Sequence, residues 1–303
     1  MTTPGRPLRF GLAGTGYWAR VTHAPALAST EGVEFTAVWG RNYEAAAALA
    51  AGYGAVPSSD LDVFLEEIDA VAFAVPPDVQ SPIAARAART GKHLLLEKPI
   101  AVSEADADDL VQAVADGGVA SVVFFTSRFW PGIRAWLADV AGRGGWEGGW
   151  AAWLGTALDP ASPFNTPWRR EKGGLWDVGP HVVSLLWASL GPVVSVTADA
   201  GRGDLAHLVL HHEGGATSAA TVTGGAPAAA AGFELSLWGE HGRSAAPTTA
   251  DDDPVAALRV ALTELAGNAR AGRQSHPCDV WFGRDVGHVL AQAQREIDAL
   301  PRR

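Results

Sequence analysis

A glycine-rich turn near the amino terminus constrains this chain more than any other feature. The apolar run from Leu8 to Ala13 leads into Gly14-Thr15-Gly16-Tyr17-Trp18-Ala19, which predicts a strand, a tight turn and the start of a helix. Gly14 permits the turn, Gly16 lets the backbone approach a pyrophosphate, and the small Ala19 lets helix and strand pack closely. We therefore expect a dinucleotide to bind at Gly14, Thr15, Gly16, Tyr17, Trp18 and Ala19.

The end of the second expected strand favours one cofactor over another. An NAD site usually carries Asp or Glu about 20 residues after the turn, where the carboxylate binds the ribose 2′-hydroxyl. Here the strand over residues 34–39 ends in Gly40-Arg41-Asn42, with no carboxylate at its tip. Arg41 can pair with a 2′-phosphate and stack on adenine, so we expect NADP(H) to be preferred, with NAD(H) possible and with Asn42 beside it. The alternative is an exposed arginine that ends a turn.

Composition limits the class of protein. At 303 residues the chain exceeds the usual single-domain size, so two domains are expected. A formal charge of −10 without a basic run argues against nucleic acid or a membrane surface as partner. The single Cys278 excludes an intramolecular disulfide and a zinc site built from cysteines. Because no signal peptide and no long apolar stretch is recognised, the sequence predicts a cytoplasmic protein.

Residues 1–125 have the pattern of an α/β domain with a doubly wound parallel sheet, a Rossmann fold. Residues 69–75 form an uninterrupted apolar run, which is typical of strands buried on both faces of a parallel sheet. Strands and helices alternate along the segment. Besides those already named, strands are expected at 93–96 and 119–126, and helices at 44–51, 60–67, 83–90 and 103–115.

Residues 126–303 have a different pattern, which predicts an α+β substrate-binding and oligomerisation domain with an open, mainly antiparallel sheet. Short apolar strands follow one another through glycine-rich turns. The expected strands are 149–158, 193–200, 205–212, 216–223 and 233–238. The expected helices are 133–140, 177–190, 255–270 and 282–300, with a polar loop at 159–174.

Glu97-Lys98-Pro99 follows the fourth parallel strand, at the carboxyl edge where open α/β sheets bind ligands. The chain has three lysines, and a lysine can move a proton or polarise a hydroxyl because burial lowers its pKa. We expect the nicotinamide near Pro76, Pro77 and Glu97, with Lys98 beside it. The alternative for Lys98 is a solvated side chain.

Asp177 and His181 form a second candidate for acid/base chemistry. If the segment from Asp177 is helical, the two residues are four apart and share one face of the helix. A carboxylate one turn away can orient a histidine and keep it active near neutral pH. The alternatives are a helix cap for Asp177 and a packed side chain for His181.

Several short motifs follow one another along the chain: the glycine turn, His23-Ala24-Pro25-Ala26-Leu27, Gly91-Lys92-His93, Glu97-Lys98-Pro99, Arg128-Phe129 with Pro131, Trp168-Arg169, and Gly173-Gly174 through His181. Taken together, these segments resemble the glucose-fructose oxidoreductase/inositol dehydrogenase/MocA family. The resemblance implies that Lys98, Asp177 and His181 match the catalytic lysine, aspartate and histidine of that family. It also implies hydride transfer between a nicotinamide and a secondary alcohol or ketone on a sugar, inositol or related ring.

This chain departs from the family pattern at two positions. Ser184 stands where the family often has aspartate, and Gln80 where it frequently has histidine. We expect the substrate, a small molecule, to contact Arg128, Trp168, Arg169 and Trp176. Two alternatives remain open: a regulator that binds NADP without catalysis, and a glycoside hydrolase of the same family that oxidises its substrate transiently.

Two further expectations concern metals and assembly. His207 and His211 are too far apart along a strand to share one ion, so we expect no metal. Trp146 and Trp150 fall on one face of the expected strand and Trp153 on the other. A sheet with large apolar groups on both faces needs cover, which predicts a homodimer or homotetramer formed through it.

Overall fold

The computed structural model describes residues 6–247 and 253–301. Its first sheet has six parallel strands in the order β3-β2-β1-β4-β5-β6. That order reverses direction between β1 and β4, and open α/β sheets bind ligands beyond the carboxyl ends of the strands at such a point. The strands are β1 (Leu8–Ala13), β2 (Val33–Trp39), β3 (Val56–Ser58), β4 (Ala70–Phe73), β5 (His93–Leu96) and β6 (Ser121–Val123).

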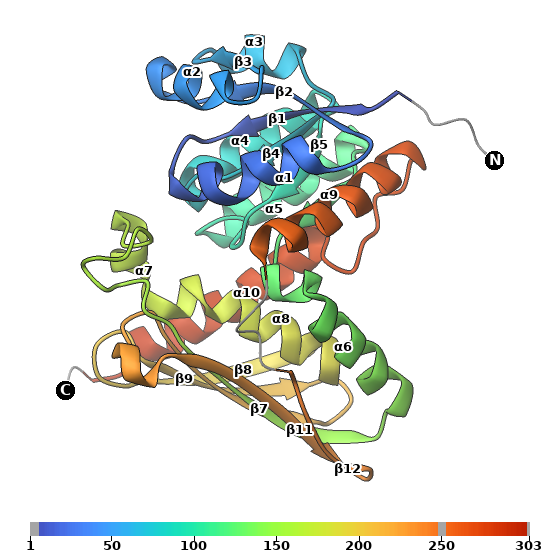
Figure 1. The fold of residues 1–303 in the computed structure, drawn as a ribbon. Helices are drawn as coiled ribbons and strands as arrows, with labels where there is room; N and C mark the ends of the chain where they lie inside the picture. Colours follow the sequence, from blue (N-terminus) through green and yellow to red (C-terminus); the bar gives the residue numbers. More distant parts are fainter. Residues whose placement is uncertain (1–5, 248–252, 302–303) are drawn as a thin grey trace. The chain divides into compact units, whose positions relative to one another are not determined.

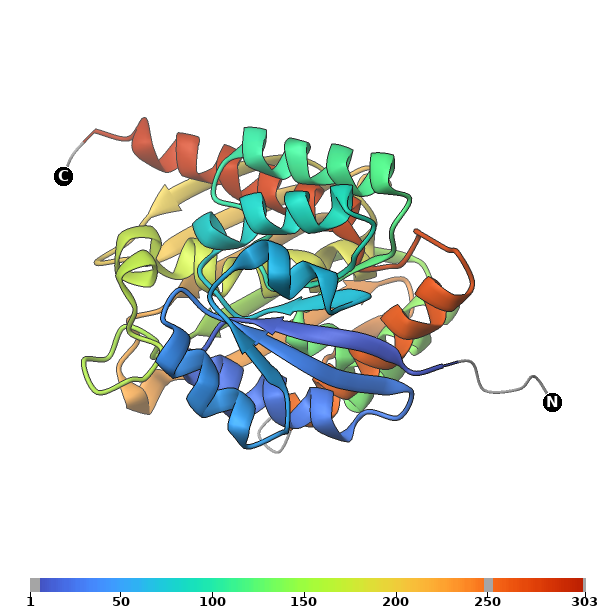
Figure 2. The ribbon, with the colours of Figure 1, turned by 90° about the horizontal axis from the view of Figure 1, so that it is seen from above.

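Helices cover both faces of this sheet, with α4 and α5 on one and α1 and α9 on the other (Figures 1 and 2). A π-helical segment, Ala19–His23, runs directly into α1. The side chains of Asp60 and Ser103 cap α3 and α5, as their sequence positions predict. The helices of this sheet are α1 (Ala24–Ser29), α2 (Tyr43–Ala51), α3 (Leu61–Glu66), α4 (Pro77–Arg89), α5 (Glu104–Gly117) and α9 (Pro254–Arg270).

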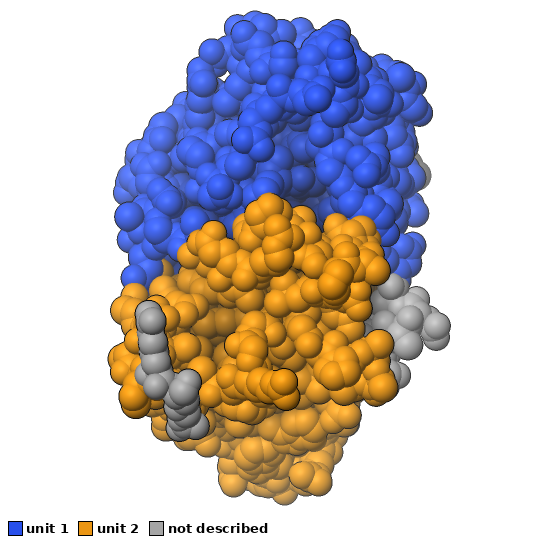
Figure 3. Space-filling view, turned by 90° about the vertical axis from the view of Figure 1, so that its left-hand side faces the viewer, with its two compact units in different colours: residues 1–129, 253–284 blue, residues 130–252, 285–303 orange. Residues whose placement is uncertain are grey.

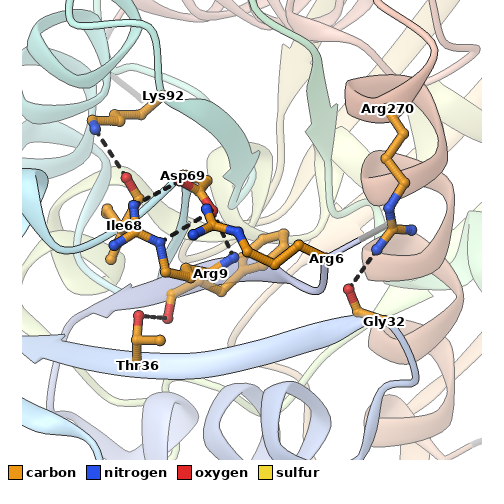
Figure 4. A network of polar contacts seen from close by, with 9 residues as sticks. Arg6, Arg9, Gly32, Thr36, Ile68, Asp69, Lys92 and Arg270 are labelled. Atoms are coloured by element: carbon orange, nitrogen blue, oxygen red, sulfur yellow. Dashed lines mark hydrogen bonds and ion pairs between the residues drawn. The ribbon is translucent and has the colours of Figure 1, made fainter. Parts of the chain in front are cut away.

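A charged cluster of Arg6, Arg9 and Asp69 stabilises the amino end of this sheet (Figure 4). Asp69, just before β4, accepts hydrogen bonds from Arg6 Nη2 at 2.9 Å and from Arg9 Nη2 at 2.8 Å. Burial alone would raise the pKa of Asp69, but hydrogen bonds and charge from Arg9 outweigh it and lower that pKa. Because these residues lie at the opposite end from the glycine turn, we assign the cluster to the fold and not to ligand binding.

The second sheet is mixed, in the order β12-β11-β7-β10-β9-β8. Four of its five strand pairs are antiparallel, and β7 and β10 are parallel. The prediction of an open, mainly antiparallel sheet is therefore confirmed. Its strands are β7 (Trp146–Leu154), β8 (Val193–Ala200), β9 (Ala206–His212), β10 (Thr217–Thr223), β11 (Gly232–Gly239) and β12 (Gly242–Ala245).

The two faces of the second sheet differ. Along β9 buried and exposed residues alternate, with His207, Val209 and His211 exposed. Helices lie against the other face, where α8 packs on β7 (Figure 1). The helices of this part are α6 (Pro131–Arg143), α7 (Pro167–Asp177), α8 (Gly179–Leu190) and α10 (Val280–Asp298). Two short 3₁₀ segments complete the described elements, Thr126–Phe129 and Ala228–Ala230.

The chain divides into two compact units that are not continuous in sequence (Figure 3). The first unit comprises residues 1–129 and 253–284, and the second comprises 130–252 and 285–303. Helix α9 follows the second sheet in sequence but packs on elements of the first, including β5. The division at residues 125 and 126 stays a prediction about domain boundaries.

Three expectations about local structure were wrong. The expected loop 159–174 contains the start of α7, which begins at Pro167 and has a break at Gly173 (φ 67°, ψ −170°). Helix α4 begins at Pro77, not at Ile83, because a proline is tolerated in the first turn of a helix. Asp177 ends α7 and His181 lies in α8, so the two do not share the face of one helix as expected.

Candidate functional site

The glycine turn lies at the carboxyl end of β1, beside the end of β4. Gly14 has φ 130°, and a Cβ there would collide with the carbonyl oxygen of Ala74. At Gly16, by contrast, no described atom beyond the adjoining backbone lies within 4 Å of the position that a Cβ would take. A side chain would fill this open space, which is what a pyrophosphate needs in order to approach the backbone. The turn therefore fits the expected dinucleotide.

The helix that follows the turn is held by packing and by a side-chain hydrogen bond from Trp18. Ala19 is fully buried, consistent with close packing of helix on strand. The helix starts at Tyr17, and the first turn of a helix points its backbone amides toward the turn that precedes it, where an anion can bind. The indole Nε1 of Trp18 donates to Glu97 Oε1 at 2.6 Å, so the side chain of this expected cofactor residue is directed at Glu97.

Glu97 connects the glycine-turn helix with the end of β5. The Oε1 of Glu97, which accepts from the indole of Trp18, also lies 3.0 Å from Nε2 of His23. The side chain of His23 is completely buried. Lys98 follows directly, and its backbone N–H donates to Glu97 Oε2 at 3.3 Å. The sequence motif thus places Lys98 at the carboxyl edge of the parallel sheet, in the same unit as the glycine turn.

The tips of β2 and β4 carry the other expected cofactor residues. Arg41 is exposed directly after β2, while Asn42 caps α2 by accepting a hydrogen bond from the amide of Ala45 at 3.0 Å. The side chain of Asn42 therefore has a structural task, whereas Arg41 faces solvent. Pro76 is half-buried after β4, and Pro77 is buried in the first turn of α4.

Asp177 and Arg169 form an ion pair in the second unit. Arg169 Nε donates to Asp177 Oδ1 at 2.9 Å, and both side chains are largely buried. The guanidinium of Arg169 also lies over the ring of Trp168, 4.6 Å from its centroid. The expected catalytic aspartate and two expected substrate residues are thus brought together, a pairing that the sequence pattern did not suggest.

The ring of His181 stacks on an indole from the inner face of the second sheet. The rings of His181 and Trp153 have centroids 5.0 Å apart with 24° between their planes. Trp176, 5% exposed, donates through Nε1 to Gln294 Oε1 at 3.2 Å. Arg128, the remaining expected substrate residue, lies in the first unit with its guanidinium 5.6 Å from the centroid of the Phe282 ring.

Asp204 supports this region, and the sequence analysis missed it. Its Oδ2 accepts from the amides of Gly174 at 2.8 Å and Gly224 at 2.7 Å, and its Oδ1 accepts from Thr223 Oγ1 at 2.6 Å. The carboxylate thereby connects Gly174, which follows the break in α7, to Thr223 at the end of β10. No motif marks Asp204, because its partners are between 19 and 30 residues away in sequence.

Within residues 6–247 and 253–301, no group of three or more histidine, cysteine or acidic side chains could hold a metal ion. In the same part of the chain, none of the helices combines the length and the apolar character that a membrane span requires.

The strand order and the glycine turn define a dinucleotide-binding α/β protein, and comparison with known proteins gives its family. Residues 8–125 match the oxidoreductase family with an NAD-binding Rossmann fold, and residues 148–245 match the GFO/IDH/MocA C-terminal domain. The chain belongs to the GFO/IDH/MocA oxidoreductase family.

Curated relatives have related names. A dTDP-3,4-didehydro-2,6-dideoxy-alpha-D-glucose 3-reductase of Streptomyces violaceoruber is 30% identical over 66% of this chain and 59% of its own length. Inositol 2-dehydrogenase of Rhizobium meliloti is 31% identical over 64% of this chain and 58% of its own length. The alignments thus span less than two thirds of either relative.

Solved structures share the whole fold. GenD2 from gentamicin A biosynthesis, in complex with NAD, has a TM-score of 0.84 at 20% identity and covers 98% of this chain and 96% of its own. A myo-inositol dehydrogenase from Corynebacterium glutamicum has a TM-score of 0.82 at 22% identity, covering 97% of this chain and 99% of its own.

Proposed function

We propose that this protein is an NAD(P)-dependent oxidoreductase that transfers a hydride between the nicotinamide and a secondary alcohol or ketone of a sugar, inositol or related small molecule. The observation that carries the proposal lies within the first unit. The glycine turn ends β1 at the reversal of strand order, and Lys98 follows β5 on the same edge. The names of the curated relatives, a sugar reductase and an inositol dehydrogenase, agree with this substrate class.

The residues divide into two groups in the proposed reaction. The backbone from Gly14 to Ala19 would hold the pyrophosphate, and the bound cofactor supplies the hydride chemistry. Lys98 would donate a hydrogen bond to the substrate oxygen, and His181 would exchange the proton with that oxygen. Asp177 would orient His181 or hold a second hydroxyl. A panel of inositols, sugars and keto-sugars, assayed by nicotinamide absorbance with both cofactors, tests the proposal; no turnover on any of them would count against it.

The proposed cofactor preference rests on Arg41. We expect NADPH to bind at least about tenfold more tightly than NADH, because one charge-assisted pair with the 2′-phosphate is worth about 1.4 kcal/mol. Arg41→Ala should remove this preference by weakening NADPH binding alone, as measured by fluorescence titration of both nucleotides. Arg89→Ala, at an exposed arginine paired with Asp109, is the matched control and should leave both affinities unchanged. Equal affinities in the unmodified protein would refute the role of Arg41.

We also propose that one face of the second sheet, the face on which Val209 of β9 is exposed, joins copies of this chain in a homodimer or homotetramer. The register places Val209, Ala219, Trp150 and Ser236 in one row across this face. Val209 is 44% exposed, and Trp238 on the neighbouring row is 37% exposed. Apolar side chains on an open sheet favour burial against a second copy.

The oligomer should respond to a charge on that face. Val209→Arg should shift the protein toward monomer in light scattering at micromolar concentration, because a guanidinium would be buried without a partner. Val56→Arg places the same change at an exposed valine of the first unit, and it should leave the mass unchanged. A monomeric unmodified protein at that concentration would contradict the proposed assembly.

A further inference from the structure

Gln80 bonds to the backbone on both sides of Lys98, which no feature of the sequence suggested. Its side chain is fully buried on α4. The carboxamide Oε1 accepts from the amide of Glu97 at 2.8 Å, and Nε2 donates to the carbonyl of Glu97 at 2.8 Å. Nε2 is also 3.3 Å from the carbonyl oxygen of Pro99 and 3.2 Å from that of Ile100.

These contacts resemble the pairing between strands. The amide and the carbonyl of Glu97 both bond to one carboxamide, which fixes the carboxamide's orientation because only its oxygen can accept from an N–H. The strand β5 has ended at Leu96, so Gln80 takes the place of a neighbouring strand for one further residue. An apolar side chain of the same length could fill the space but could form none of these bonds.

We infer that Gln80 is a positioning residue for Lys98. The carboxamide holds the carbonyls on either side of Lys98, those of Glu97 and Pro99, while Trp18 and His23 hold the side chain of Glu97. The backbone that carries the lysine is therefore fixed from both α4 and the glycine-turn helix. The inference that this matters for turnover rests on the proposed function, whereas the positioning itself is measurable without substrate.

Loss of stability alone would not test this inference. Removing the carboxamide leaves buried backbone groups without partners, which destabilises the fold whatever Lys98 does. The test needs a signal from Lys98 itself, and the chain provides one because its only lysines are Lys92, Lys98 and Lys172. After reductive ¹³C-methylation each lysine gives its own NMR resonance, and loss of one peak in Lys98→Arg assigns Lys98.

In Gln80→Met we expect the Lys98 resonance to move, while the resonances of Lys92 and Lys172 stay within their line widths. Lys92 is the internal control. Its Nζ donates to the carbonyl of Ile68 within the same unit, so a general disturbance of that unit would move its resonance as well. Gln112→Met, the same change at an exposed glutamine on α5, should move none of the three. A folded Gln80→Met with an unmoved Lys98 resonance would overturn the inference.

A measurement on the unmodified protein covers the case in which Gln80→Met does not fold. The amide of Glu97 has Gln80 as its acceptor, so it should exchange with deuterium at least about 100-fold more slowly than an open loop amide. Exchange of the Glu97 amide at the rate of an open loop would overturn the inference, as would an unmoved Lys98 resonance in Gln80→Met.

Kinetics link the inference to turnover. Gln80→Met should lower kcat/KM by about 10-fold to 100-fold, the scale for a misplaced catalytic group, with NADPH affinity held within a few-fold. In a Lys98→Met background the same change should cost less than about twofold, because a positioning residue acts through the lysine. An equal cost in both backgrounds would indicate a merely structural role and contradict the inference. If Lys98→Met itself leaves turnover intact, the proposed catalytic role of Lys98 fails, while the NMR and exchange results still decide whether Gln80 positions this lysine.

Discussion

Replacement of Lys98 by methionine is expected to lower kcat/KM by about 100-fold or more while NADPH affinity stays within a few-fold. Methionine matches the four-atom apolar stem of lysine but lacks the amine, and about 100-fold is the usual scale for losing a polarising or proton-transfer group. Nucleotide titration and steady-state kinetics on one competent substrate measure the two effects separately. Lys92→Met, at the lysine that bonds Ile68, is the matched control and should leave kcat/KM within a few-fold.

The opposite result has a clear meaning. Intact turnover in Lys98→Met would end the catalytic assignment of Lys98. A protein that binds NADP tightly with no turnover on the whole panel of substrates would instead favour the regulator that the sequence left open. Tightly held cofactor with hydrolysis and no net redox change would favour the glycosidase.

A comparable loss, about 100-fold in kcat/KM, is expected from His181→Ala, again with little change in NADPH affinity. The double variant with Lys98→Met should be little worse than either single one, since groups that act as a unit are strongly non-additive. Because His181 stacks on Trp153, the alanine variant also removes a packing contact, so thermal unfolding must be measured alongside. His241→Ala, at an exposed histidine in the turn between β11 and β12, serves as the control.

Asp177→Asn separates orientation from chemistry. Asparagine keeps the shape of the carboxylate but weakens the ion pair with Arg169, and it should lower kcat/KM less than His181→Ala does if Asp177 only orients other groups.

Additive losses in kcat/KM in the variant with both Lys98→Met and His181→Ala would show that Lys98 and His181 do not act in one step.

Local patterns predicted the order of elements because each depends on neighbouring residues. The strand at 93–96 and the caps at Asp60 and Ser103 follow from hydrophobic runs and from side chains that reach the next turn. The edge strand β3 was missed, because three residues including a proline carry no alternating pattern. The parallel pairing of β7 with β10 was missed because it joins segments about 70 residues apart, which no local pattern reports.

The candidate site shows the same division between local and distant information. Glycine conformation at Gly14 and the place of Lys98 after a strand were predictable from short motifs. The bonds from Trp18 and His23 to Glu97 span 79 and 74 residues, and those of Gln80 span 17 to 20. Such contacts depend on how strands and helices pack, so these bonds could not be predicted, although the sequence had singled out the residues that form them.

The placement of α9 sets an order in which the protein can be completed as it is synthesised. This helix buries Leu258, Leu262 and Leu265, and it belongs to the first unit although about 250 residues precede it. A ribosome that has produced the whole parallel sheet has therefore not yet supplied the helix that covers part of it. The first unit reaches its final packing only after the chain of the second sheet has emerged, and a fragment that stops after β6 would leave that apolar surface open to other proteins.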